Sequence, residues 1–128
     1  MADNDNVLRT KILIEVNQDF HQGDNVFKAL ESESEPWLLT ELFSCFEEED
    51  STIRELASQA IVKVASTQAG REILCEDESG LLLNIRKLFD DDVVQIRANA
   101  YKSFIALAEF TYGVDQIIRQ GIVAVLIT

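Results

Sequence analysis

Few side chains in this sequence have the types and spacing needed for catalysis or metal binding. His21 is the only histidine, and the two cysteines are Cys45 and Cys75. Zinc sites need ligands at short spacings such as CxxC or HExxH, and a serine or cysteine nucleophile needs a base beside it. Neither arrangement is present, and the sequence has no glycine-rich phosphate loop. We therefore expect no metal site, no cofactor and no enzymatic activity.

Two runs of carboxylates, at residues 47–50 and 90–92, are the other groups that could bind a cation. A calcium loop needs ligands at alternate positions and a central glycine, and neither run has that pattern. We expect both runs to be solvated loops whose last carboxylates favour the start of a helix.

The charge and composition favour an intracellular chain and exclude some classes of partner. The net charge is −12, and such an excess of carboxylates repels both phosphate backbones and anionic membranes. No apolar run approaches the roughly 20 residues that cross a bilayer, and the first residues, MADNDN, lack the apolar core of a signal peptide. We expect a cytoplasmic location, reduced thiols, and no nucleic-acid or membrane partner.

The elements that would position any functional side chain are set by an internal repeat. At an offset of 43, residues 37–75 lie over residues 80–118 without a gap. Chance would give about two or three identical pairs over such a length at typical residue frequencies. The observed pairs are Leu38/Leu81, Leu39/Leu82, Phe46/Phe89, Ile53/Ile96, Arg54/Arg97, Ala57/Ala100, Ala65/Ala108 and Gly70/Gly113.

The period and the apolar spacing indicate the content of each unit. A period of about 40–47 residues is typical of HEAT and armadillo repeats, which contain two or three helices. Apolar residues recur here at spacings of three and four, which indicates helices. We expect a short, a middle and a long helix, at about 70–76, 80–90 and 93–110 in one unit. Gly70 and Gly113 should each follow a long helix, as C-terminal glycines do, and open a short helix.

The predicted fold class is all-α, a right-handed α-solenoid of armadillo-type three-helix repeats with an N-terminal helical cap. The cap occupies residues 1–35, and the repeats occupy residues 36–78 and 79–112. Residues 113–128 begin a further, incomplete repeat without a long helix. The C-terminal edge therefore continues in a longer array, marks a shortened form, or serves for self-association.

The sequence also predicts a helix cap, a residue at the edge of the first repeat and the buried side of the N-terminal helix. Asp92 is expected to cap the second long helix. Trp37 stands at the edge of the first repeat, where it either anchors a partner or covers the core. In the cap, a spacing of four predicts one buried helix side formed by Leu8, Ile12, Val16 and Phe20.

The motifs resemble those of the armadillo superfamily. The sequence GVDQIIRQGIVAVL at residues 113–126 resembles that superfamily's short helix, glycine and start of the middle helix. Residues 36–127 are most similar to the armadillo-repeat proteins of the ciliary radial spoke. The segments that carry this similarity are ASTQAGREILCEDE at 65–78 and IRANAYKSFIALAEF at 96–110. The resemblance implies a role as an axonemal scaffold in motile cilia.

The resemblance also implies where a partner would bind. Nuclear-import receptors of this fold carry a tryptophan and an asparagine four residues apart on each long helix, and these clamp basic peptides. The matching positions here hold neither, so a nuclear-localisation receptor is not expected. Lys63 and Lys102 are either solvated or available to an acidic peptide. The residues at the clamp positions are Gln59, Lys63, Lys102 and Ala106.

Arg54 and Arg97 recur at the start of the long helices, directly after the acidic loops. A guanidinium group there can pair with a carboxylate of a neighbouring loop. We interpret both arginines as structural links between repeats.

These patterns favour a non-catalytic protein–protein interaction scaffold, and the resemblance implies that it acts in ciliary axoneme or radial spoke assembly. The alternative is a transient armadillo-type receptor for a peptide or a chaperone. A scaffold should resist salt, whereas a transient charged groove should release its partner as salt screens the contacts.

Overall fold

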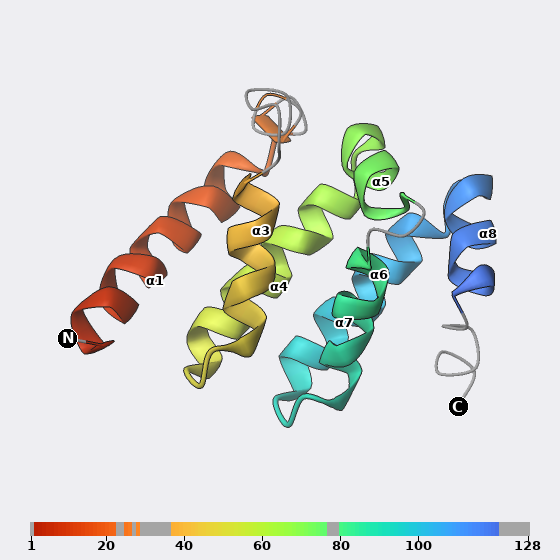
Figure 1. Cartoon of the computed structure of the whole chain (residues 1–128). Coiled ribbons are helices and arrows are strands. Elements are labelled where there is room, and N and C mark those ends of the chain that lie inside the picture. The colour runs from red at the N-terminus through yellow and green to blue at the C-terminus, as the bar shows by residue number, and fades with distance from the viewer. Residues whose placement is uncertain (1, 23–24, 27, 29–36, 77–79, 121–128) are drawn as a thin grey trace.

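The computed structural model describes residues 2–22, 25–26, 28, 37–76 and 80–120 of the chain, without the side chains of residues 2–5 and 37. Within these residues every regular element is a helix, which confirms the all-α class (Figure 1). The elements are α1 (Ala2–Asp19), α3 (Trp37–Ser44), η1 (Cys45–Glu47), α4 (Ser51–Ala65), α5 (Gln68–Leu74), α6 (Leu81–Arg86), η2 (Lys87–Asp90), α7 (Val94–Leu107) and α8 (Thr111–Arg119).

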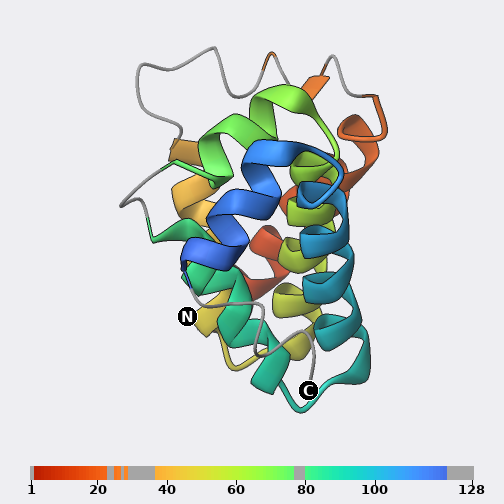
Figure 2. The same cartoon turned by 90° about the vertical axis from the view of Figure 1, so that its right-hand side faces the viewer.

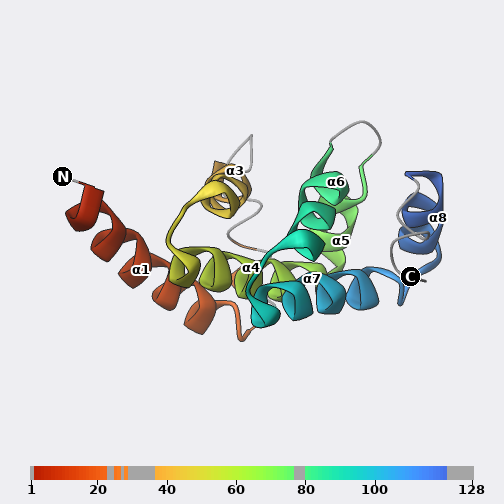
Figure 3. The ribbon, with the colours of Figure 1, turned by 90° about the horizontal axis from the view of Figure 1, so that it is seen from below.

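The helices form two layers. The long helices α1, α4 and α7 lie side by side and run in the same direction, with α4 in contact with both of the others (Figure 1). Helices α3 and α6 both lie on the same side of the long helices and form the second layer (Figure 3). The short helices α5 and α8 start at the C-terminal ends of α4 and α7, at the upper end of the long helices in Figure 2.

The two copies of the internal repeat have the same succession of elements and bury equivalent positions. In α4 the buried side contains Ile53, Ala57, Ile61 and Val64. In α7, at an offset of 43, it contains Ile96, Ala100, Phe104 and Leu107. These side chains recur every three or four residues, so each long helix presents one continuous apolar side to the second layer. The core therefore lies between the two layers.

The glycines lie near the start of the short helices, as predicted, but they do not cap the long helices. Helix α4 ends at Ala65 and α7 at Leu107, whereas Gly70 and Gly113 lie inside α5 and α8. A Cβ atom at Gly70 would lie 1.9 Å from the Val64 carbonyl oxygen, and one at Gly113 would lie 2.0 Å from the Leu107 carbonyl oxygen. The glycines thus allow each short helix to press against the end of the preceding long helix. The described glycine with positive φ is Gly80, which precedes α6.

The buried side of α1 also differs from the prediction. Leu8 is 59% exposed and Ile12 is 49% exposed, whereas Leu13 and Phe20 are 5% and 6% exposed. The pattern of apolar residues is correct, but α4 covers a neighbouring side of the helix. Val16 is partly buried.

The start of α7 differs as well. Its N-cap is Val93, and no side chain caps the helix, so the prediction for Asp92 is wrong. The backbone N–H of Val93 instead donates to Oδ1 of Asp91 at 3.0 Å. The side chain of Trp37 and residues 121–128, which belong to the predicted incomplete repeat, lie outside the described part of the chain.

We predict that Gly70→Ala lowers the free energy of unfolding by about 2 kcal/mol or more. The new methyl group would collide with the Val64 carbonyl, which is part of the α4 backbone, and would force α5 away from α4. Urea unfolding followed by circular dichroism measures this change. The matched control is Gly80→Asn, since Gly80 has open space around it and asparagine tolerates positive φ. Equal, small losses for both variants would contradict the close-approach role.

Candidate functional site

The uncovered side of the long helices retains two of the predicted partner-binding residues. Gln59 of α4 and Lys102 of α7 are equivalent at an offset of 43, and they are half-buried and exposed respectively. Each lies two residues from a buried alanine that faces the second layer, and two residues along a helix turn a side chain nearly to the opposite side. Gln59 and Lys102 are therefore placed where another protein can reach them.

The other two predicted positions are occupied by packing. The Nζ of Lys63 donates to the backbone oxygen of Asn17 at 2.7 Å and to its Oδ1 at 3.1 Å. Burial lowers the pKa of Lys63. The ammonium group thus stabilises the C-terminal end of α1, where free carbonyls and the helix dipole favour a cation. Ala106 is only 8% exposed, so its side chain does not form part of the surface.

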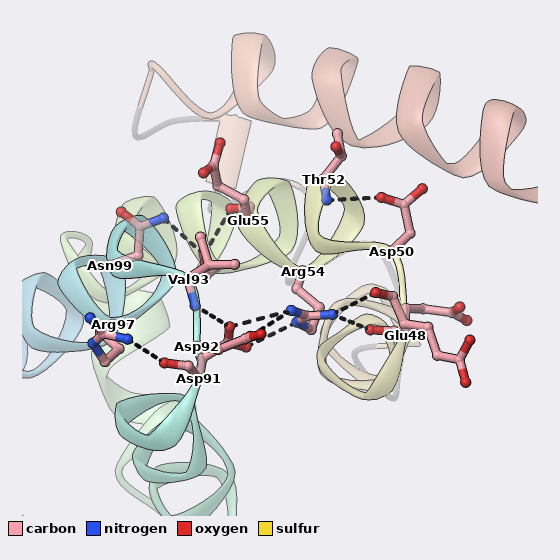
Figure 4. A network of polar contacts seen from close by, with 12 residues as sticks. Glu48, Asp50, Thr52, Arg54, Glu55, Asp91, Asp92, Val93, Arg97 and Asn99 are labelled. Carbon is pink, nitrogen blue, oxygen red and sulfur yellow. Dashed lines mark hydrogen bonds and ion pairs between the residues drawn. The ribbon is translucent and has the colours of Figure 1, made fainter.

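Arg54 joins two consecutive units (Figure 4). Its Nε lies 2.9 Å from Oδ2 of Asp91, and its Nη2 lies 3.3 Å from the other oxygen of the same carboxylate. Its Nη1 donates at 2.8 Å to the backbone oxygens of Glu48 and Glu49. One guanidinium group therefore fixes its own acidic loop and the acidic loop of the following unit at once.

The Asp91 carboxylate is suited to this role. Burial by itself raises its pKa, but hydrogen bonds from Arg54 and from the Val93 backbone outweigh that effect, and the pKa lies below the ordinary value of 3.8. The Asp91 side chain is only 9% exposed. Asp92, which is 92% exposed, lies at the edge of the same contact.

Two further arginines occupy related positions. Arg9 of α1 pairs with Glu48 in the loop before α4. Arg97 of α7 donates from Nη1 to the backbone oxygen of Asp91 at 2.6 Å. This contact is equivalent, at an offset of 43, to the bond from Arg54 to the Glu48 oxygen. Within the described residues, Arg97 has no carboxylate of a following unit to bind.

A line of buried polar contacts connects the long helices, and sequence reasoning missed it. Asn17 of α1 donates to the Leu56 backbone oxygen at 2.9 Å. Asn99 of α7 donates to Oγ of Ser58 at 2.8 Å, and both side chains are buried. Asn17 and Asn99 lie on helix sides that are otherwise apolar, and this feature of the sequence could have predicted the contacts. A buried amide needs a specific hydrogen-bond partner.

The two thiols lie inside the core of the structure. Cys45 and Cys75 are buried, and burial raises the pKa of both thiols, that of Cys75 to about 11. Thiolate is the reactive form, so both groups remain inert near neutral pH. In the part of the chain that the structure describes, no cluster of three potential metal ligands occurs, and no helix is long and apolar enough to cross a membrane.

Several large apolar side chains are exposed on the outer sides of the end helices. Val94 and Ile105 of α7 are 70% and 64% exposed, and Ile118 of α8 is 59% exposed. Alignment of the two copies could have drawn attention to Ile118, because it is an apolar residue at the position equivalent to Cys75, which is fully buried.

No protein-family model, curated protein or solved structure matches this chain. The assignment of function therefore rests on the repeat, the layer geometry and the surfaces described above.

We predict that Arg54→Ala lowers the free energy of unfolding by about 2 kcal/mol, because it leaves the Asp91 carboxylate largely buried without its cation. Arg97→Ala should have a smaller effect, since it removes one hydrogen bond to a backbone oxygen. Urea unfolding of the two variants and the parent tests this order. A larger loss for Arg97→Ala would contradict the link between units.

The Arg54–Asp91 contact should also depend on pH in a defined direction. Because the folded-state pKa of Asp91 is lowered, the pair contributes stability above the unfolded pKa of about 3.9 and loses it as the pH falls through the folded pKa. A double-mutant cycle of Arg54→Ala and Asp91→Asn should give a coupling of about 1–2 kcal/mol at pH 7, which declines toward zero as the pH falls below the folded-state pKa of Asp91. The same cycle for Arg119 and Asp115, an exposed pair within α8, should give little coupling at either pH.

Proposed function

We propose that this chain is a non-catalytic protein-binding module, an armadillo-type right-handed α-solenoid that acts as a scaffold. The observation that carries this proposal is the side-by-side packing of α1, α4 and α7 in one direction, with a repeated second layer. Stacked helical repeats of this kind generate an extended surface that is larger than any one unit. The uncovered side of the long helices, which includes Gln59 and Lys102, is the binding surface.

The finer proposal is assembly of the ciliary axoneme, in particular the radial spoke. It rests on the similarity of residues 65–78 and 96–110 to radial-spoke armadillo proteins. The second segment makes up most of α7, whose uncovered side carries Lys102. The first contains α5 and the close approach at Gly70. Both segments therefore contribute to the repeat unit and its exposed side.

A scaffold fits the surface better than a transient receptor for an acidic peptide. A groove that captures acidic peptides needs several available cations, and Lys63 is already held by Asn17. The described face therefore offers fewer available cations than the sequence suggested, and a partner must also be held by uncharged contacts. Such contacts are insensitive to salt.

We predict that the tagged chain, expressed in ciliated cells, remains with the axonemal fraction after extraction with about 0.5 M salt, because about this concentration screens charges beyond a few ångströms. Its partner should be recovered at constant stoichiometry from ciliated cells. Non-ciliated cells of the same type provide the control. Complete release at about 0.15 M salt would favour the transient receptor, and identical recovery from both cell types would contradict the ciliary role.

We also predict that Lys102→Glu weakens retention of this partner about tenfold without a change in melting temperature, because it reverses a charge on the uncovered side of α7. Arg86→Glu is the matched control, since it makes the same change at an exposed position of α6 in the other layer. Quantitative pull-down with each purified variant measures the difference. If both variants retain the partner equally, the uncovered side of the long helices is not the binding surface.

A further inference from the structure

A cleft of about 420 Å³ opens between the two units in the second layer. One wall belongs to α3 and η1 of the first unit, and the other wall belongs to α6 and η2 of the second unit. Figure 3 shows α3 and α6 on the same side of the long helices. The cleft therefore lies in the layer opposite the uncovered side of the long helices.

The apolar part of the cleft is largely aromatic. Phe43 and Phe46 both line it, and their ring centroids lie 5.1 Å apart with the rings edge to face. Leu88 of η2 adds an apolar surface from the second unit. Phe43 and Leu88 are buried, whereas Phe46 is only partly buried and retains accessible ring surface. The face of such a ring attracts a cation as well as apolar groups.

The polar side chains of the cleft differ from those of the core, because several have no partner among the described residues. Asn84 is half-buried, yet its amide makes no hydrogen bond to them, whereas the buried Asn17 and Asn99 both do. Glu47 and Lys87 are exposed on opposite walls and take part in none of the ion pairs that the described residues form. An amide, a carboxylate and an ammonium group are thus available to a ligand.

The surrounding charge indicates which kind of group the cleft binds. Asp91 also lines the cleft, but Arg54 holds its carboxylate, so these two charges compensate each other. Arg54 also brings the acidic loops of both units together at this end of the cleft, where Glu49 and Asp92 are exposed (Figure 4). The negative charge there exceeds the positive charge of Lys87, and this excess favours a cation.

We propose that this cleft binds a segment of another protein that carries an arginine or lysine side chain. The cation of the segment lies against the Phe46 ring and pairs with Glu47. Backbone carbonyls next to the cation accept hydrogen bonds from Asn84 and Lys87 on the other wall. A basic peptide segment supplies a cation and neutral acceptors together, as these two walls require, whereas an acidic segment meets an excess of carboxylates.

This inference does not rest on the function proposed above. The cleft lies in the second layer, whereas the proposed binding surface with Gln59 and Lys102 lies on the uncovered side of the long helices. The two surfaces also differ in the residues that form them, so variants can alter one and leave the other unchanged. A module with both surfaces holds two proteins at once and links them.

The test uses three blocked tripeptides that differ only in the residue between two leucines, which is arginine, glutamine or glutamate. Each peptide is titrated into the full chain, and the backbone and side-chain amide signals are followed by NMR. The arginine peptide should bind with a dissociation constant of about 1 mM, because ligands of this size reach only modest affinity, and it should shift the Asn84 side-chain signals. The glutamine peptide should bind about threefold more weakly and the glutamate peptide about tenfold more weakly.

Two variants separate binding from folding. Glu47→Lys should weaken binding of the arginine peptide about tenfold and strengthen binding of the glutamate peptide, because it reverses the charge of one wall. Glu15→Lys makes the same change at an exposed position of α1 outside the cleft, and it should bind like the parent. Asn84→Ala should weaken binding about threefold without lowering the melting temperature, since the amide has no partner among the described residues and alanine favours a helix.

Four results would overturn the proposal. The absence of any shift at about 10 mM arginine peptide would exclude the site. Equal affinity of the three peptides would show that the cleft does not select a cation. Shifts confined to α1, α4 and α7 would place the peptide on the uncovered side of the long helices. A lower melting temperature of Asn84→Ala with unchanged binding would show that Asn84 serves the fold instead of a ligand.

Discussion

The constraint on which the rest of the structure depends is that α4 must be covered on several sides at once. Its apolar side faces the second layer, and its two flanks contact α1 and α7. Ile53, Ala57 and Val64 become fully buried only because three separate parts of the chain meet there. A unit of this length cannot exclude water from such a helix by itself. Each unit therefore owes its stability to its neighbours, and Arg54, which holds the acidic loops of two units, fixes their spacing.

The sequence was sufficient for the helical class, for the location of most described helices and for the equivalence of the two copies, because burial of one helix side leaves a regular apolar pattern. It was not sufficient where the role of a residue depends on which helix packs against it. The pattern in α1 shows which residues are apolar, but it does not show that α4 covers Leu13 instead of Leu8. Gly70 after a long helix looks the same in sequence whether it ends that helix or admits the next one. Lys63 is visible as a cation, but its contact with the end of α1 requires the tertiary structure.

The candidate site shows the same division. Gln59 and Lys102 could be assigned from the repeat alone, because equivalent positions share one side of a helix. The repeated positions of Arg54 and Arg97 indicated a structural role for both arginines. Which carboxylate Arg54 binds could be identified only from the structure, because Asp91 lies in a different unit. The surface that results combines an uncovered polar side along the long helices with apolar ends, and these two kinds of surface suit different partners.

The buried amides between the long helices have a consequence for mechanics. Asn99 and Ser58 face each other in an interior where every described buried polar side-chain atom has a partner. A slide of α7 by one turn along α4 would separate these groups and leave both without hydrogen bonds in a medium of low polarity. Under tension, the helices should therefore hold their positions until a contact of this kind breaks, and then yield abruptly instead of stretching gradually. The distance between equivalent points on successive helices is in this way kept constant under load.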